Sequence, residues 1–270
     1  TLTCLAAGLL TAALPAVSAA AYPDKPIRLV VPFPPGQGAD ILARLIGQHL
    51  AAALGQPIVV ENKVGAGGII GTAFAAKAAP DGYTLYMGSS GPLAFGSHVY
   101  KAVGFDTLKD FAPISNIASV TQVLVTAPAS QLASAKDVVE RARAQPGMVP
   151  FGSAGSGTTS HLTMELFTQM SGISLSHVPY KGSSTSMIDV MAGRVPLMFD
   201  SLPGVLTNVK SGSLRAIAVA SAQRDPLLPN VPTVAESGVP GFATSGWIGL
   251  LAPARTPPQI VDQLHTAVAK

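Results

Sequence analysis

The 270-residue sequence contains a single cysteine, Cys4, and is poor in charged and aromatic residues. A lone thiol excludes a disulfide within the chain and a cysteine-based metal site. Charged residues make up 11% and aromatic residues 6% of the chain, and Lys and Arg form no run, so the features of a nucleic-acid-binding surface are missing. The formal net charge of +3 supports only weak attraction of anions. We therefore expect no nucleic-acid partner.

The common motifs of catalysis and cofactor binding are missing as well. Ser153 and Ser156 lack the flanking glycines of a nucleophile elbow, and no phosphate-binding loop ends in Gly-Lys-Ser/Thr. The glycines of residues 65–71 lack the spacing of a dinucleotide fingerprint, and the five histidines show no metal-ligand spacing. We expect no cofactor, no metal and no catalytic residue. A Ser–His–Asp set assembled from distant residues remains the alternative.

The N-terminal segment has the pattern of an export signal. Residues 5–17 form an uncharged Ala/Leu run, and small residues follow it before polar Tyr22, which predicts cleavage near Ala19 to Ala21. We assign residues 1–21 to a partial signal peptide, with a hydrophobic anchor as the alternative. Cys4 lies inside it without a lipid-attachment motif, and no later segment is long and apolar enough to cross a membrane. The missing initiator Met and the uncapped helical pattern reaching Lys270 indicate truncation at both ends.

The rest of the chain alternates between strand-like and helix-like patterns, which predicts an α/β fold with parallel sheets covered on both faces. The expected strands are 27–32, 57–61, 84–87, 121–126, 148–152, 174–178, 196–199, 214–220 and 247–252. The expected helices are 40–54, 68–78, 135–144, 158–170, 185–192, 202–211 and 257–270.

Two lobes accommodate this order better than one. The first series of elements stops near Gly104, residues 105–118 show neither period, and a second series runs from Val120 to Ala220 before a Pro-rich loop. If the tail returns to the first lobe, lobe 1 comprises 22–117 plus 222–270 and lobe 2 comprises 118–221. Two chain crossings, near 115–120 and 220–224, then permit hinge closure around a ligand.

A Gly-rich turn occurs twice, each time between an apolar run and a helical pattern. Such turns leave backbone N–H groups free, and the helix behind them points its positive dipole end at the same place. One turn in each half of the chain predicts a cleft that holds an anion from both sides. The candidate binding residues are Phe33, Pro35, Gly36, Gln37, Gly38 and Asp40 in the first turn and Gly155, Ser156, Gly157 and Thr158 in the second.

The role of each polar candidate is open between ligand contact and local structure. Asp40 fits the start of a helix, or holds the loop's own N–H groups, better than it fits contact with a bare carboxylate. Ser89 and Ser90 lie in a third loop at the same sheet edge and are secondary candidates. Asp200 follows a strand and is either an N-cap or a cleft residue. His161 fits a structural role better than a ligand role.

Seven motifs in order resemble the Bug (TctC-like) extracytoplasmic solute receptors of tripartite tricarboxylate transporters; they lie at 31–40, 65–68, 80–84, 155–162, 178–182, 198–200 and 228–233. The resemblance implies a two-lobed periplasmic binding protein (Venus-flytrap) that closes on a small organic carboxylate and delivers it to a two-subunit membrane permease. It implies that backbone amides and ordered waters of loops 33–40 and 153–158 hold the carboxylate oxygens. We expect a monomer.

One departure from the family pattern concerns Gln37. The family usually has adjacent glycines where this chain has Gly36-Gln37, so we expect the Gln37 side chain to point at the ligand or over it. Two alternatives to transport stay open at this point. One is an exported hydrolase with a distributed Ser/His/Asp site, and the other is a ligand-binding sensor subunit.

Overall fold

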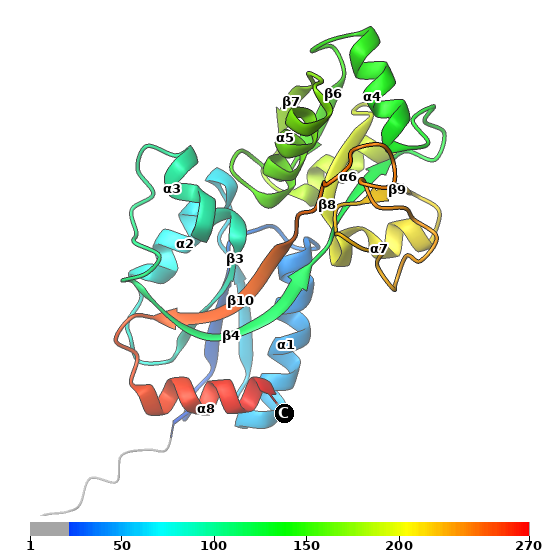
Figure 1. The fold of residues 1–270 in the computed structure, drawn as a ribbon. Coiled ribbons are helices and arrows are strands. Elements are labelled where there is room, and N and C mark those ends of the chain that lie inside the picture. The colour runs from blue at the N-terminus through cyan, green and yellow to red at the C-terminus, as the bar shows by residue number, and fades with distance from the viewer. Residues whose placement is uncertain (1–21, 270) are drawn as a thin grey trace, which may run out of the picture.

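The chain forms two lobes, each built on a five-stranded sheet (Figure 1). The structure is a computed structural model and describes residues 22–269. The expected signal peptide with its predicted cleavage site, and Cys4, therefore lie outside the described residues. None of the helices in the described part of the chain has the length and hydropathy needed to span a bilayer.

Lobe 1 has the strand order β2-β1-β3-β10-β4, with helices on both faces of the sheet. On one face, Leu29 and Leu250 pack with Leu50 of α1 and Leu264 of α8, and on the other Tyr86 packs with α2. The elements are β1 (Ile27–Val31), α1 (Gly38–Leu54), β2 (Ile58–Asn62), η1 (Ala66–Gly68), α2 (Ile69–Ala76), β3 (Thr84–Ser89), η2 (Gly91–Phe95), α3 (Gly96–Val99), β4 (Phe111–Val120), β10 (Gly246–Pro253) and α8 (Pro258–Ala269).

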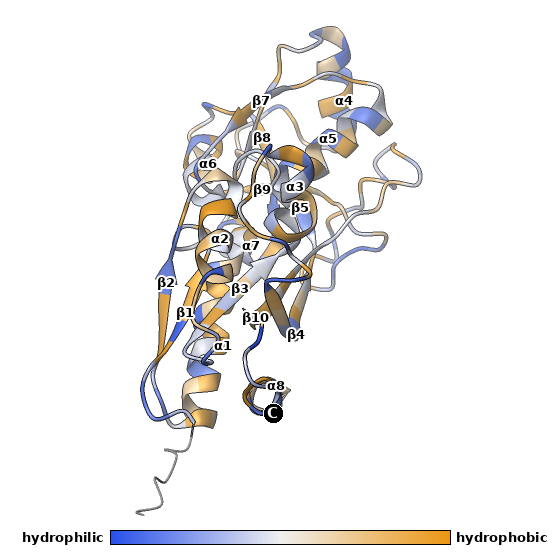
Figure 2. Ribbon diagram, turned by 90° about the vertical axis from the view of Figure 1, so that its left-hand side faces the viewer, coloured by the Kyte–Doolittle hydropathy of each residue, from blue (hydrophilic) through white to orange (hydrophobic). Residues whose placement is uncertain are grey.

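Lobe 2 repeats this plan with the strand order β7-β6-β8-β5-β9. Phe151 and Phe199 pack with Phe167 of α5 on one face, while Val123 packs with Val205 of α7 on the other. The elements are β5 (Gln122–Thr126), α4 (Ala135–Ala144), β6 (Pro150–Ser153), α5 (Thr159–Ser171), β7 (Ser176–Pro179), α6 (Ser183–Met191), β8 (Leu197–Ser201), α7 (Leu202–Lys210) and β9 (Arg215–Val219). Figure 2 shows hydrophobic residues along α1 and β1, and hydrophilic residues in several connecting loops, on α4 and along part of β2.

Both sheets are mixed, which corrects the expectation of parallel sheets. In lobe 1, β10 runs antiparallel to β3 and β4, and in lobe 2, β5 runs antiparallel to β8 and β9. The remaining pairs are parallel. The reason is that β5 and β10 are the first strands that follow the crossings along the chain. They begin at the cleft and run away from it, whereas β3 and β8 end there.

The first crossing joins β4 to β5 through Thr121 alone. The second was expected at 220–224, and that expectation is wrong. Residues 221–244 stay with lobe 2, because Thr233 bridges to Val219 and Phe242 is buried in the lobe 2 core. The chain returns to lobe 1 between residues 244 and 246, where Gly246 pairs with Val120, so the two crossings lie side by side.

Strand β4 is an element that the sequence did not reveal. Its burial does not alternate regularly, because the pairing with β10 shifts register between Ile248 and Gly249 and again between Leu250 and Leu251. Each shift moves the next side chains to the other face, so the period of two that marks a strand is lost.

Candidate functional site

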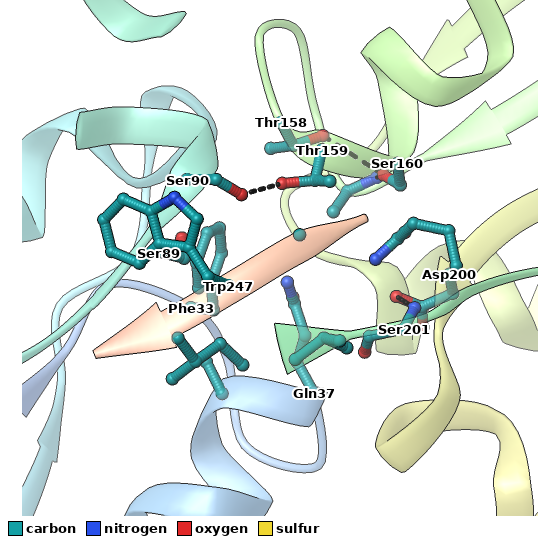
Figure 3. A pocket seen from close by; sticks show the side chains of 16 residues that line it. Phe33, Gln37, Ser89, Ser90, Thr158, Thr159, Ser160, Asp200, Ser201 and Trp247 are labelled. Carbon is teal, nitrogen blue, oxygen red and sulfur yellow. Dashed lines mark hydrogen bonds between the residues drawn. The ribbon is translucent and has the colours of Figure 1, made fainter. Parts of the chain in front are cut away.

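A cleft of about 430 Å³, counting the part open to solvent, lies between the lobes at the crossings. Side chains from both lobes point into it, with Trp247 and Gln37 facing Thr159 and Ser160 (Figure 3). No Lys, Arg or His occurs among the described residues that line it. The lining residues are Phe33, Gln37, Ala39, Ser89, Ser90, Val120, Gln122, Ala154, Thr158, Thr159, Ser160, Asp200, Ser201, Gly246, Trp247 and Ile248.

The first Gly-rich turn reaches the cleft only in part. Phe33 and Gln37 line the cleft, whereas Pro35, Gly36, Gly38 and Asp40 do not. Gly36 has φ +80°, as a turn glycine should, and its N–H donates to Asp40. The turn thus orients the start of α1 toward the cleft, where Ala39 supplies the lining.

Asp40 stabilises this turn from the side that faces away from the cleft. Its carboxylate accepts hydrogen bonds from Gly36 N (3.0 Å), Arg44 Nε (3.0 Å) and Asn62 Nδ2 (2.9 Å). Burial opposes ionisation of Asp40, but the bonds from Arg44, Asn62 and Gly36 outweigh it and lower the pKa of the carboxyl. Asn62 also donates to the Phe33 carbonyl at 2.8 Å. The carboxylate of Asp40 therefore has a structural role and does not face the cleft.

In the second Gly-rich turn, backbone N–H groups donate to side chains of the same segment and not to the cleft. Gly155 N–H donates to Ser153 Oγ (3.0 Å) and Gly157 N–H donates to His161 Nδ1 (3.3 Å). Gly155, Ser156 and Gly157 do not line the cleft, whereas Thr158 does. The following residues, Thr159 and Ser160, were not candidates in the sequence, yet both line the cleft at the start of α5.

The starts of α1 and α5 face the cleft from opposite lobes. The first N–H groups of a helix lack partners within it and carry partial positive charge. Ala39 belongs to the first turn of α1, and Thr159 and Ser160 to the first turn of α5. An anion in the cleft would meet both helix ends. This arrangement stabilises negative charge without a cationic side chain.

Two stacked histidines support the second turn. The rings of His161 and His177 have centroids 4.0 Å apart, and His177 also stacks on Phe151. Burial and the neighbouring His161 lower the pKa of His177 to about 4. His161 accepts the Gly157 N–H through Nδ1, so that nitrogen is unprotonated.

Ser153 and His177 are the two residues that most resemble the nucleophile and base of a hydrolase. Ser153 Oγ and His177 Nε2 lie 2.6 Å apart, but Ser153 is completely buried and does not line the cleft. Ser153 Oγ also accepts the Gly155 N–H. The pair therefore braces the turn, and no substrate reaches the hydroxyl in this arrangement. Across residues 22–269, no group of three or more His, Cys, Asp or Glu side chains is placed to hold a metal ion.

The secondary candidates all line the cleft. Ser89 and Ser90 lie at the end of β3 and directly after it, and Asp200 lies near the end of β8. Asp200 is 3% exposed, its Oδ1 accepts the Ser201 N–H at 2.8 Å, and its Oδ2 has no partner among the described residues. Burial raises the pKa of Asp200 to about 6.

A second group of lining residues that the sequence did not suggest comes from the crossings. Val120 and Gln122 flank the first crossing, and Gly246, Trp247 and Ile248 follow the second. Trp247 is 36% exposed. Its being the only tryptophan of the chain is the one sequence feature that could have drawn attention to these lining residues.

The lobes touch each other around the cleft. Ser90 and Thr159 share a hydrogen bond between their hydroxyls at 2.9 Å, and the Tyr100 hydroxyl donates to the Ser156 carbonyl at 2.9 Å. Glycines permit this approach, since a Cβ at Gly67 would overlap the Ser156 carbonyl. The structure therefore shows the lobes closed.

Two α/β lobes that close over a cleft at two adjacent crossings define a periplasmic binding protein fold. The chain matches the tripartite tricarboxylate transporter family receptor over residues 42–270, and it belongs to that family. It is 42% identical over 250 residues to protein BugT of Bordetella pertussis, which covers 92% of this chain and 77% of BugT. The family resemblance drawn from the seven motifs is thereby confirmed.

Solved structures support the same assignment. The R. palustris protein Rpa4515 with adipate has a TM-score of 0.90 and 40% identity, over 92% of this chain and 83% of its own. MatC from Rhodopseudomonas palustris with bound malate has a TM-score of 0.87 and 31% identity, over 92% of this chain and 84% of its own. The chain is thus a solute-binding receptor of the tripartite tricarboxylate transporter family, and its fold is one of binding rather than catalysis.

Proposed function

We propose that this protein captures a small organic carboxylate in the periplasm and delivers it to a two-subunit membrane permease, without breaking a bond. The observation that carries the proposal is the cleft between two helix N-termini, where the described lining residues are mostly neutral hydrogen-bonding groups, with Asp200 as the one acid and no cationic side chain. Relatives of this fold are bound to adipate and malate, which are both dicarboxylates.

The residues proposed to hold the ligand are the uncharged sequence candidates that line the cleft, together with the other polar groups found there. Asp200, the remaining candidate in the lining, is left out because an ionised carboxylate would repel the ligand. Hydrogen bonds between a carboxylate and neutral donors are charge-assisted, so several of them replace a salt bridge. The proposed contacts are Phe33, Gln37, Ser89, Ser90, Gln122, Thr158, Thr159, Ser160, Ser201 and Trp247, with backbone amides at the starts of α1 and α5.

Closure of the lobes is the proposed signal to the permease. A ligand stabilises the closed form only to the extent that it binds that form more tightly. The cleft is shared by both lobes, so its contacts exist in full only after closure. The two crossings, at residues 120–122 and 244–246, are the proposed hinge.

The test is a thermal-shift panel of mono-, di- and tricarboxylates, with the corresponding neutral amides as controls. A ligand at one hundred times its Kd adds about 2.7 kcal/mol to the free energy of unfolding. We expect a shift with at least one carboxylate and none with its amide. The proposal fails if no carboxylate raises the melting temperature at a pH that keeps it ionised.

Two further measurements separate transport from the alternatives. Pull-down with the permease subunits, in the presence and absence of ligand, tests delivery, and pull-down with a histidine kinase tests a sensor role. Ester and amide turnover by wild type and Ser153→Ala tests the hydrolase. Because Ser153 is buried, we expect no turnover by either protein.

A further inference from the structure

Gln37 joins the two lobes through its side chain. It precedes α1 in lobe 1, and its Oε1 accepts the backbone N–H of Ser183, the first residue of α6 in lobe 2, at 3.1 Å. The bond is buried, and Gln37 itself is only 8% exposed. Because the partners belong to different lobes, the bond requires closure.

Helix α6 has no cap of its own at this end. Its N-cap residue is Gly182, which has no side chain to accept a first-turn N–H. Gln37 provides the missing oxygen from the other lobe. Pro34 lies against the same glycine, where a Cβ would overlap the proline ring. The loop before α1 therefore docks onto the start of α6 at two points.

The hydrogen bond to Ser183 also sets the orientation of the Gln37 amide. A backbone N–H can only donate, so the atom it meets is the carbonyl oxygen of the side chain. The NH₂ group is then the end of the amide left for the cleft, which Gln37 lines. Figure 3 shows Gln37 reaching into the cleft from the side of α1. A ligand thus meets a donor at this position and not an acceptor.

We propose that Gln37 couples closure to ligand recognition: its Oε1 latches lobe 1 to the start of α6, and the latched amide presents Nε2 to an oxygen of the bound carboxylate. This inference rests on the proposed function for its ligand but not for its latch. It makes Gln37 a specificity residue that prefers hydrogen-bond acceptors on the ligand.

Two substitutions separate the latch from the donor. Gln37→Glu has the same shape and keeps an acceptor for Ser183, while it turns the cleft-facing donor into a carboxylate oxygen. Gln37→Asn suits the N-cap of α1 but is one methylene too short to reach Ser183. Gln48→Glu is the matched control, because it makes the same charge change on an exposed part of α1.

The latch is tested by hydrogen exchange of the Ser183 amide, with the lobes held closed in every variant by a disulfide between Ser90→Cys and Thr159→Cys, whose wild-type hydroxyls lie 2.9 Å apart, so that the comparison needs no ligand. We expect exchange about tenfold or more faster in Gln37→Asn than in wild type, because one buried hydrogen bond is lost. Gln37→Glu should protect the amide as well as wild type does, since an anion suits a helix N-terminus. Equal exchange in wild type and Gln37→Asn would overturn the latch.

The role of Gln37 Nε2 as a donor to the ligand is tested by measuring the Kd for malate and for adipate in calorimetric titrations. We expect Gln37→Asn to bind about tenfold more weakly than wild type, and Gln37→Glu more weakly still because two negative charges meet. Gln48→Glu should bind as wild type does. Unchanged binding by Gln37→Glu would overturn the donor role. If wild type binds neither acid, the proposed function loses its support from these ligands, and the exchange experiment still decides the latch.

Discussion

Gly38→Ala blocks closure while leaving each lobe intact. Gly38 is the first residue of α1 and is not among the glycines with positive φ, so alanine suits its backbone. A Cβ there would overlap Ser201 Oγ and lie 3.2 Å from Ser201 Cβ, both in the other lobe. The Ser201 hydroxyl can rotate aside, so the contact with its Cβ sets the cost, near the low end of the overpacking range at about 1 kcal/mol. Because only the closed form bears that cost, ligand binding should weaken about fivefold.

The assay is a fluorescence titration that uses Trp247, the only tryptophan of the chain, as a reporter in the cleft wall. The melting temperature without ligand should change little, because the free protein can open. Gly47→Ala is the matched control on the same helix, since its Cβ would meet Ile58 of the same lobe at 3.4 Å. It should bind as wild type does.

A compensating change provides the sharpest check. Ser201→Gly removes both atoms that the new methyl group would meet, so it should restore binding in the Gly38→Ala background relative to Ser201→Gly alone. Wild-type affinity in Gly38→Ala, or no recovery in the double variant, would refute the steric account of closure.

Three other predictions concern a closure contact, the buried Asp200 and the half-buried His177. Tyr100→Phe removes the hydrogen bond to the Ser156 carbonyl and should weaken binding about two- to tenfold in the same titration, with the free protein's melting temperature unchanged. Asp200 has a pKa of about 6 against its ordinary 3.8, so the native state holds the proton more tightly and the free energy of unfolding falls as pH rises from about 4 to 6. Asp200→Asn should abolish this loss, which urea unfolding at several pH values across that range would measure. His177 changes stability with pH in the opposite direction. Its pKa is about 4 in the native state against 6.5 ordinarily, so the free energy of unfolding falls as pH drops from about 6.5 to 4. His177→Gln should flatten that decline, and an unchanged pH profile would contradict the assignment.

The sequence was a good guide to the individual elements, because their patterns are local. Residues 135–144 were expected as a helix and form α4, where Ser134 and Asp137 make a capping box. The turn glycines Gly36, Gly155 and Gly157 do have positive φ. Each of these features depends on residues within a few positions of one another, so a periodic or turn signal reveals it.

The candidate site was predicted only in part, for a physical reason. The sequence pointed to the glycine turns, and the turns do lie beside the cleft. Their amides, however, are largely satisfied internally by Asp40, Ser153 and His161, so the next residues along the chain form the lining. These partners lie only two to four residues along the chain, but contacts distant in sequence hold two of them in place, Asn62 for Asp40 and His177 for Ser153, and no local pattern records those contacts.

The amino-acid sequence by itself determined the α/β alternation, the two Gly-rich turns and the family. Tertiary structure alone decided which side chains face the cleft, where the second crossing falls and how the lobes meet. Residues 221–244 joined lobe 2 because Val234, Val239 and Phe242 complete its core, although their sequence reads as a loop. Gln37 acquired its role because closure brings it to Ser183, 146 positions away. Such contacts depend on how packed surfaces fit together, and that fit exists only once both lobes are formed.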